Sequence, residues 1–569
     1  MRSPVLPAGR WTVLAVICAA ILVVVIDVTV LHVAAPAMTE ELEPSAVALL
    51  WIIDVYPLVV APLLVASGAL GDRIGRKRIL LAGLAVFGAA SALAAFAWTP
   101  AVLIGARAVM GVGGALILPA SMSIVRDVFE DRDERRTAVG IWSATMAGGA
   151  ALGPLVGGFL VEHWWWGAVF LINVPVVLLV LPIGAKLLPE SRAAEPPPWD
   201  MAAVVLAGVG ILGVAFGLKQ GARHGFADPV VLAVLVVAIA SLVAFVRRQL
   251  ARSEPLLDVR LFADRAFAVA VGCVLLAMFG LVGLELFFAQ YLQLVLGLEP
   301  LAASVRLLPL MLASLAGGLL AAPILRRSGT RATITGGLLL TTVALLPLLA
   351  LGVEDRYLLL ALPFVALGFG LEIALVAAND VIISAVPADR AGNAASIEET
   401  AYELGGGLGV AVLGSILAAV YSSALGSVPG VDAGAMDASG ESLGRAVEVA
   451  AGLPAAVGSA LVAHASDAFV RGLHVVLIVS FVLLAASALL AALVLRRPAA
   501  GGCDGGPRGD AAPSDAGAIG TADGVLGPDR IRRDDGVRRA ERALGADGAA
   551  TGAGGGPSPS RTQVVCDTP

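Results

Sequence analysis

Three ionisable residues interrupt apolar runs that are long enough to cross a lipid bilayer. They are Asp27, Asp54 and Arg107. Counted along helices at about 1.5 Å per residue, all three fall in the outer half of a membrane. Arg107 can pair with Asp27 or with Asp54, which would offset the cost of burying a charge, so a fixed salt bridge is one interpretation. Two acids against one base favour the other interpretation, in which one carboxylate remains free to bind and release a proton.

A second group of acids lies in the apolar run 392–421. Glu399 and Glu403 are four residues apart and share one face of a helix, whereas Glu398 points about 100° away. Glu403 lies about 16 Å into this run, close to the middle of a bilayer. An apolar environment favours the neutral form of a carboxyl group, so this one can hold a proton and release it when a cation arrives. Two further acids within apolar runs are candidates for proton or substrate binding: Glu285 and Glu372.

Aromatic side chains follow the first of these further acids. Phe287, Phe288 and Tyr291 could offer an aromatic surface to a flat organic cation. A packing or lipid-facing role explains these three residues equally well.

The sequence predicts neither an enzyme active site nor a bound cofactor. Histidines are scattered, and no Ser/His/Asp or His/Glu metal-ligand spacing occurs. The four cysteines lie far apart, which argues against a zinc site or a disulfide framework. A nucleotide-binding GxxxxGK[ST] motif is absent from the sequence, so ATP is disfavoured as an energy source.

The elements that must position these residues are membrane-spanning helices. Only 14% of the residues are charged and 58% are hydrophobic, whereas soluble proteins have about 25% charged residues. Only helices and closed barrels satisfy backbone hydrogen bonds in lipid, and continuously apolar runs exclude barrel strands. We therefore predict an all-α integral membrane fold. The predicted spans are 11–36, 46–70, 79–98, 101–125, 137–161, 165–188, 200–218, 229–246, 266–295, 301–325, 332–352, 357–386, 392–421 and 472–495.

Loop charges predict the orientation of these fourteen spans, because Lys and Arg are retained in cytoplasmic loops. With the N-terminus placed in the cytoplasm, most Lys and Arg residues fall in cytoplasmic segments. The opposite side is left with Lys219, Arg223, Arg356, Arg445 and Arg471. This asymmetry predicts that both termini lie in the cytoplasm, and it favours an even number of spans.

The loop between the second and third spans reads GALGDRIGRKR. Its glycines permit a tight backbone, and an acid at a helix end among several cations can form a breakable ion-pair latch between helices. The string resembles the loop signature of the major facilitator superfamily. In LRRSGTR, a weaker echo in the second half of the chain, Gly329 stands in the place of Gly75 and Arg326 in that of Asp72. The predicted latch residues are Gly68, Asp72, Arg73, Gly75 and Arg76.

In the fifth span, GGAALGPLVGGFL places Gly149, Gly153 and Gly157 four residues apart on one helix face, with Pro154 among them. Small residues at this spacing let helices approach closely, so ordinary membrane packing is one explanation. The whole string also resembles the antiporter motif of drug-exporting members of the superfamily, which favours export over import.

Four further strings resemble the fourteen-helix drug:proton antiporter branch of this superfamily, which includes multidrug and quaternary-ammonium exporters. They are DVTVLHVAAP, WIIDVYPL, RAVMGVGGA and ASIEETAYELGGGLGVAVLGS. Two positions depart from the pattern of that family: His32 stands where Asn is usual, and Met110 replaces a common Gln. Both departures leave the preferred substrate open.

The resemblance implies a monomeric, multi-pass transporter in the lipid bilayer of the plasma membrane. Its two six-helix halves would rock around a central cavity and exchange protons for lipophilic, cationic compounds. The main alternative is a dedicated exporter of one antibiotic or metabolite; a membrane enzyme or a sensor fits the sequence less well. The predicted divisions are a cytoplasmic N-terminus (1–10), an N-terminal half (11–188), two inserted helices (189–264), a C-terminal half (265–495) with a long outer loop (422–470), and a disordered cytoplasmic tail (496–569).

Overall fold

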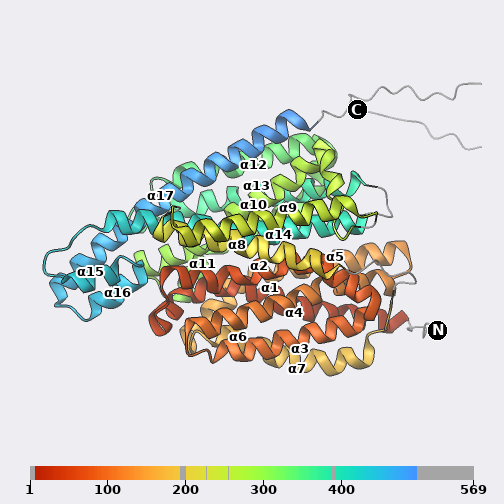
Figure 1. The fold of residues 1–569 in the computed structure, drawn as a ribbon, viewed down its shortest axis with the longest axis horizontal. Helices are drawn as coiled ribbons and strands as arrows, with labels where there is room; N and C mark the ends of the chain where they lie inside the picture. Colours follow the sequence, from red (N-terminus) through yellow and green to blue (C-terminus); the bar gives the residue numbers. More distant parts are fainter. Residues whose placement is uncertain (1–6, 193–199, 226, 254, 387–390, 496–569) are drawn as a thin grey trace, which may run out of the picture. The chain divides into compact units, whose positions relative to one another are not determined.

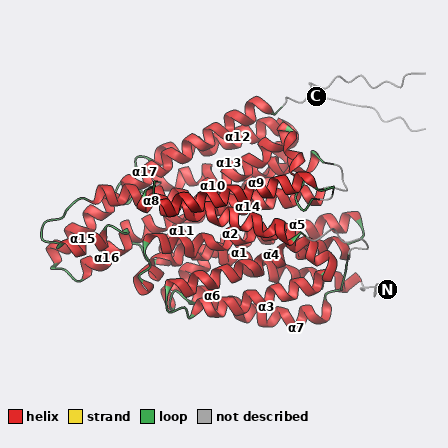
Figure 2. Cartoon of the chain, in the orientation of Figure 1, coloured by secondary structure: helices red, strands yellow, loops and turns green. Residues whose placement is uncertain are grey.

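The computed structural model describes residues 7–192, 200–225, 227–253, 255–386 and 391–495, and all regular structure within these ranges is helical (Figure 2). Fourteen helices in the described ranges are long and apolar enough to cross a membrane. The predicted all-α fold with fourteen spans is therefore confirmed. The predicted tail, 496–569, and residues 1–6 of the predicted N-terminal segment lie outside the described residues.

The helices fall into three sets along the chain. The N-terminal half contains α1 (Pro7–Leu42), α2 (Ala46–Ile74), α3 (Arg76–Ala95), α4 (Pro100–Val128), α5 (Arg132–His163), and α6 (Ala168–Leu171) with α7 (Asn173–Leu187), which together make one span. The inserted helices are α8 (Met201–His224) and α9 (Pro229–Ala251), followed by the short 3-10 helix η1 (Val259–Ala263). The C-terminal half contains α10 (Arg265–Gln290) with the π-helical turn η2 (Tyr291–Val295), α11 (Pro300–Ser328), α12 (Thr330–Leu348), α13 (Tyr357–Ser384), α14 (Ala391–Leu425), the short helices α15 (Ala433–Ser439) and α16 (Leu443–Ala451), and α17 (Ala455–Val494).

The two halves lie side by side in Figure 1, the first drawn in red to gold and the second in green to blue. Within the N-terminal half, α1 packs against α5 and α2 against α4; within the C-terminal half, α10 packs against α14 and α11 against α13. The halves meet along two seams, where α5 contacts α11 and where α2 contacts α14. The inserted helix α8 contacts both α2 and α14, so it covers the second seam. The exact divisions at 188 and 265 remain predictions.

The starts of α1 and α15–α16 lie at opposite ends of the helix bundle (Figure 1). We call the end that carries α15 and α16 the outer end, and the end at which α1 starts and α17 finishes the inner end. The shared position of those two chain ends agrees with an even number of spans.

Glycines in the left-handed region separate helices at two equivalent inner loops. Gly75 (φ 124°) lies between α2 and α3, and Gly329 (φ 76°) lies between α11 and α12. Residues with a Cβ atom disfavour such φ values, so glycine is the residue that lets the chain turn here. At Gly75 an added Cβ would also collide with the carboxylate of Glu190. The two loop strings are thus structural as well as sequence counterparts.

Large apolar side chains cover the outside of the bundle. Leu319 and Leu493 are 73% and 74% exposed, and only 11% of the residues in an apolar 18-residue stretch of α9 are buried. Extended apolar surfaces of this kind occur where a protein faces lipid or a partner rather than water. Together with the fourteen spans, they identify a multi-pass membrane protein.

The last span begins earlier than the sequence analysis placed it. α17 starts at Ala455 instead of residue 472 and continues without a break to Val494. Arg471, which had marked a loop, is an exposed residue within this helix and does not end it. The predicted long outer loop, 422–470, is therefore shortened to residues 426–454, which contain the short helices α15 and α16.

Candidate functional site

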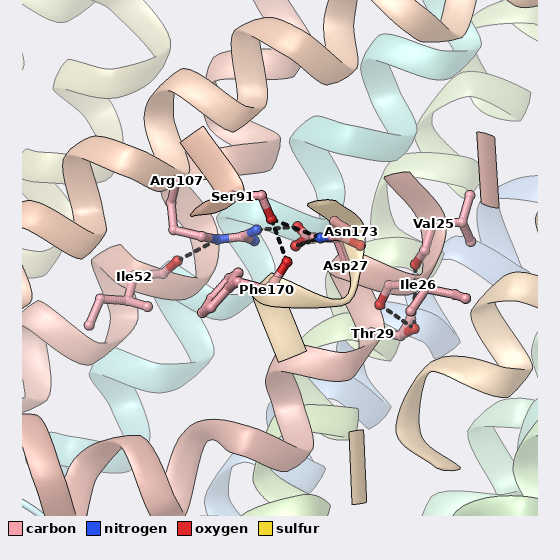
Figure 3. Close-up of polar contacts among 9 residues, drawn as sticks. All are labelled: Val25, Ile26, Asp27, Thr29, Ile52, Ser91, Arg107, Phe170 and Asn173. Atoms are coloured by element: carbon pink, nitrogen blue, oxygen red, sulfur yellow. Dashed lines mark hydrogen bonds and ion pairs between the residues drawn. The ribbon is translucent and has the colours of Figure 1, made fainter. Parts of the chain in front are cut away.

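The first candidate acid, Asp27, lies in a polar network inside the N-terminal half (Figure 3). Arg107 of α4 forms an ion pair with Asp27 of α1, and its Nε donates a hydrogen bond to the carbonyl oxygen of Ile52 at 3.2 Å. The side chains of Asp27 and Arg107 are 0% and 1% exposed. Of its two predicted partners, Arg107 therefore pairs with Asp27.

Two residues that the sequence analysis did not identify complete this network (Figure 3). Asn173 Nδ2 donates to Asp27 Oδ1 at 3.2 Å and lies 3.0 Å from Ser91 Oγ, which in turn donates to the carbonyl oxygen of Phe170 at 2.8 Å. Both oxygens of the Asp27 carboxylate thus have a donor, an arrangement that favours a fixed, fully satisfied pair. The available sequence signal was a single polar residue, Asn173, within the apolar run 165–188.

The second candidate acid, Asp54, is paired with a base that the sequence analysis had assigned to an outer loop. Asp54 Oδ1 accepts a hydrogen bond from Lys219 Nζ at 2.7 Å, and both side chains are 0% exposed. Lys219 belongs to α8, which continues to His224, so it is a residue of a span. Two acids now face two bases in this part of the protein. The prediction of two acids against one base is therefore wrong.

Three acids of the C-terminal half lack such partners. Glu372 of α13 and Glu399 and Glu403 of α14 form no hydrogen bond or ion pair with any residue that the structure describes. Tyr402 interacts electrostatically with these three acids and with Glu285, so acids from α10, α13 and α14 converge around one side chain. Within the described ranges, no group of three or more His, Cys, Asp or Glu side chains is placed to hold a metal ion.

Two neighbouring acids behave differently from this group. Glu398 accepts hydrogen bonds from Asn379 Nδ2 at 2.7 Å on both carboxylate oxygens. Glu285 Oε2 of α10 lies 3.6 Å from His32 Nδ1 of α1. This contact joins the two halves, and it places the unusual histidine of α1 directly beside a candidate acid.

Tyr56 of α2 lies between the two sets of acids. Its ring centroid is 4.9 Å from the guanidinium of Arg107, and its hydroxyl interacts electrostatically with Glu403 and Glu399 of α14 as well as with Asp27. That hydroxyl is buried without a hydrogen-bond partner among the described residues. Tyr56 therefore connects the paired network of the N-terminal half to the acids of the C-terminal half.

The aromatic residues after Glu285 do not offer a surface to a ligand. Phe287 and Phe288 are 2% exposed and Tyr291 is 1% exposed. The Tyr291 hydroxyl donates to the carbonyl oxygen of Gly352 at 2.7 Å. The packing interpretation of these residues therefore applies. The aromatic side chain that is accessible beside the acids is Tyr402, which is 43% exposed.

The predicted latch loop forms an ion-pair bridge between helices at the inner end. Arg76 Nη2 lies 2.9 Å from Asp72 Oδ1, and Arg76 Nη1 lies 2.5 Å from Asp127 Oδ2 at the end of α4. Asp127 was not predicted, because nothing in the loop string identifies its partner in another helix. Arg73 is exposed, and Gly68 approaches Pro119 of α4.

The glycines of α5 form the contact with α1. A Cβ atom at Gly149 would meet Leu22 and Val25, one at Gly153 would collide with Thr29, and one at Gly157 would lie 3.0 Å from the carbonyl oxygen of Val30. Close helix packing at the predicted spacing is thus observed, and Pro154 lies within the same stretch of α5. At one further glycine, Gly158, an added Cβ atom would collide with Pro300, Leu301 and Ser304 of α11 in the other half.

Comparisons with known proteins agree with this architecture. Residues 17–410 match the family model described as Major Facilitator Superfamily. The multidrug efflux pump LfrA of Mycolicibacterium smegmatis is 40% identical over 491 residues, which are 86% of this chain and 97% of LfrA. The methyl viologen resistance protein SmvA of Salmonella typhimurium is 39% identical over 465 residues, which are 81% of this chain and 93% of SmvA.

A solved structure supports the same fold at lower sequence similarity. A bacterial homologue of the human lysosomal transporter Spinster, in an inward-facing and occupied conformation, superposes with a TM-score of 0.61 at 19% identity. The match covers 87% of this chain and 97% of that protein. From its matching family model, its relatives and its fourteen spans, the chain belongs to the major facilitator superfamily of membrane transporters.

Proposed function

We propose that this protein exports lipophilic organic cations across the plasma membrane in exchange for protons, as a multidrug efflux transporter. Two relatives support the substrate class by name, one as a multidrug efflux pump and one as a protein of resistance to methyl viologen. Methyl viologen is a flat organic dication. We propose further that the transporter acts as a monomer with both termini in the cytoplasm.

The observation that carries this proposal is the group of unpaired acids around Tyr402. Glu372, Glu399 and Glu403 lie within membrane spans and have no base beside them among the described residues. An isolated negative charge is costly at such a depth, so each carboxyl group must be protonated or must face another cation. A proton and a cationic substrate are therefore alternative occupants of the same site, which is the requirement for exchange.

Tyr402 supplies the second element of such a site. Its ring is partly exposed beside the acids, and an aromatic face attracts organic cations. A flat, hydrophobic cation can stack on the ring while a carboxylate neutralises its charge. Glu285 lies beside this group but is not unpaired, and its contact with His32 would link occupancy of the site to the packing of α10 against α1.

The N-terminal half would act mainly as the rigid partner in this exchange. Its buried acids are neutralised by Arg107 and Lys219, and its glycines hold α5 close to α1. Rocking of one half against the other would occur along the α5–α11 and α2–α14 seams. The inner latch of Asp72, Arg76 and Asp127 would hold the N-terminal helices together during that motion.

Substrate-driven proton movement in proteoliposomes tests the proposal. Purified protein is reconstituted with a pH-sensitive dye inside the vesicles, and a panel of organic cations and neutral antibiotics is added outside. We expect several cations, methyl viologen among them, to drive proton movement, and neutral compounds to be weaker. A response to a single antibiotic would favour the dedicated exporter, and no response to any compound would contradict proton exchange.

A further inference from the structure

The inserted helix α8 places a lysine inside a cation site of the N-terminal half. Lys219 Nζ lies 2.7 Å from Asp54 Oδ1 and 3.7 Å from the centroid of the Trp51 ring. A carboxylate next to an aromatic face is the arrangement that recognises an ammonium group. We call the Trp51 ring and the Asp54 carboxylate the α2 cation box. Its occupant in this structure is a side chain of the protein itself.

We propose that Lys219 is a positioning residue: it fills the α2 cation box permanently, withholds Asp54 from protons and substrates, and fastens the inserted helices to the N-terminal half. Asp54 is thereby an anchor for α8 and is distinct from the acids proposed for exchange. The inference concerns residues outside the Tyr402 group and goes beyond the proposed function.

Burial argues that the pair is permanent. Both side chains are 0% exposed, so neither water nor a substrate reaches them in this conformation. Breaking a buried pair leaves an uncompensated charge in a medium that solvates it poorly, which is strongly unfavourable. The second carboxylate oxygen, Asp54 Oδ2, is buried and has no hydrogen-bond partner among the residues that the structure describes. Lys219 is therefore the group that compensates the Asp54 charge.

The position of α8 explains why it needs to be fixed to one half. This helix contacts α2 of one half and α14 of the other, along the seam where the halves must move. Two contacts tie α8 to α2: the ion pair, and the tilted contact of the Phe216 and Trp51 rings, whose centroids lie 6.4 Å apart. α14 carries Glu399 and Glu403. We infer that α8 and α9 travel with the N-terminal half and that α14 slides past α8.

A double-mutant cycle tests this inference. The variants are Lys219→Met, Asp54→Asn and the combination of both, with Lys219→Arg as the conservative control. Each single change leaves one buried group without its partner, so we expect substrate-driven proton exchange to fall by about tenfold or more per folded protein. The double variant replaces the pair by two neutral side chains, and we expect it to recover to within about threefold of the wild type with an unchanged pH profile. Lys219→Arg keeps the charge and should recover in part.

The outcomes separate an anchor from a proton carrier. A double variant that is as impaired as Asp54→Asn, or that has an altered pH profile, would show that Asp54 acts in its own right and would overturn the inference. Wild-type activity of Lys219→Met would overturn it as well. If the wild type moved no protons with any compound, the proposed function would fail, and melting temperatures would then test the anchor. Lowered melting temperatures of the single variants and a restored one of the double variant would support it. Additive losses in the double variant would contradict it.

Discussion

The two halves of this transporter treat their buried acids in opposite ways. In the N-terminal half, Asp27 and Asp54 are each paired with a base, Arg107 and Lys219. In the C-terminal half, Glu372, Glu399 and Glu403 have no base beside them within the described ranges. Both sets lie in membrane spans of similar hydropathy. The two sets of acids therefore differ in charge balance and not in how apolar their spans are.

This contrast assigns different work to the two halves. A neutralised and hydrogen-bonded pair is stable in one charge state, so it holds helices in place. An unpaired carboxyl group in a membrane span changes its charge state or acquires a cation. We therefore place exchange in the C-terminal half and mechanical support in the N-terminal half. Changes to the C-terminal acids should abolish transport without unfolding the protein. Changes to the N-terminal pairs should lower transport because they destabilise the fold.

The largest effect is expected for the double change Glu399→Gln and Glu403→Gln. Removal of both exchangeable protons should reduce substrate-driven proton movement by about a hundredfold, equivalent to about 2.7 kcal/mol. The melting temperature should stay the same or rise, because two unpaired acids are replaced by neutral amides. Initial rates in proteoliposomes and melting curves in detergent give the two readouts.

The matched control is Glu398→Gln in the same turn of α14. Its carboxylate is already bonded to Asn379, so we expect a change in rate of less than about threefold. Equal losses for the control and the double variant would remove the distinction between paired and unpaired acids.

The second largest effect is expected for Asp27→Asn. This change leaves Arg107 buried without its counter-charge, which costs about 3–5 kcal/mol of stability. We expect low yield of folded protein and a lowered melting temperature. Replacing both residues together, as Asp27→Leu with Arg107→Met, should recover much of the stability. A fully stable Asp27→Asn protein that no longer moves protons would place an exchange site in the N-terminal half and break the comparison.

A third test concerns the contact between α5 and α1. Gly153→Ala introduces a Cβ atom that collides with Thr29, and overpacking of this kind costs about 1–3 kcal/mol. The control is Gly148→Ala, because an added Cβ there meets nothing within 4 Å. Melting temperatures should fall for the first variant only. If both variants melted like the wild type, close packing of α5 on α1 would not support the N-terminal half.

A smaller effect is expected at the inner latch. Arg76→Gln removes the ion pairs with Asp72 and Asp127, which are partly exposed and worth about 1 kcal/mol. The transport rate should change by roughly fivefold. Arg73→Gln is the control, because Arg73 is exposed beside the same loop. The measurement is the transport rate at equal amounts of protein. Equal effects of Arg76→Gln and Arg73→Gln would mean that the total charge of the loop, and not the ion pairs, determines the rate.

The smallest effect concerns Asp200, which precedes α8 outside the membrane spans. Burial alone would raise the pKa of Asp200, but hydrogen bonds from Arg248 and the Ala203 backbone, with the charges of Arg248 and Arg252, hold it below its ordinary value. A lowered pKa contributes stability that is present above the unfolded value, about 3.9, and is lost as the pH falls through the folded value.

Asp200→Asn should therefore lower stability by about 1 kcal/mol, equally at all pH values between about 5 and 8. Melting temperatures at several pH values provide the measurement. A loss of stability that varied with pH across this range would show that Asp200 changes its protonation state there, which we expect only of the C-terminal acids.

The sequence predicted the helices more completely than the side-chain pairings between them. Span number, loop glycines and the small face of α5 depend on local composition and spacing, so they are readable from one sequence. Gly75, Gly329 and Gly153 are examples, because each has a backbone or packing role that glycine alone performs without strain. The start of α17 was missed because the charge of Arg471 resembled a loop signal.

Pairings between helices could not be predicted in the same way. Depth along a helix gives neither its rotation nor its neighbours, so Arg107 had two possible acids. Lys219 was counted with the outer loops because it lies near the end of an apolar run, although α8 continues beyond it to His224. Tyr402 was overlooked between two conspicuous acids, whereas Phe287 and Phe288 attracted attention and proved to be buried.

Proton release on substrate binding tests the central claim most directly. Purified protein in weakly buffered detergent solution is mixed with an organic cation such as methyl viologen, and the change in pH is recorded for the wild type and for Glu399→Gln with Glu403→Gln. We expect the wild type to release protons, and the variant to release none at an unchanged melting temperature. Undiminished release by the variant would contradict the assignment of exchange to the unpaired acids of the C-terminal half.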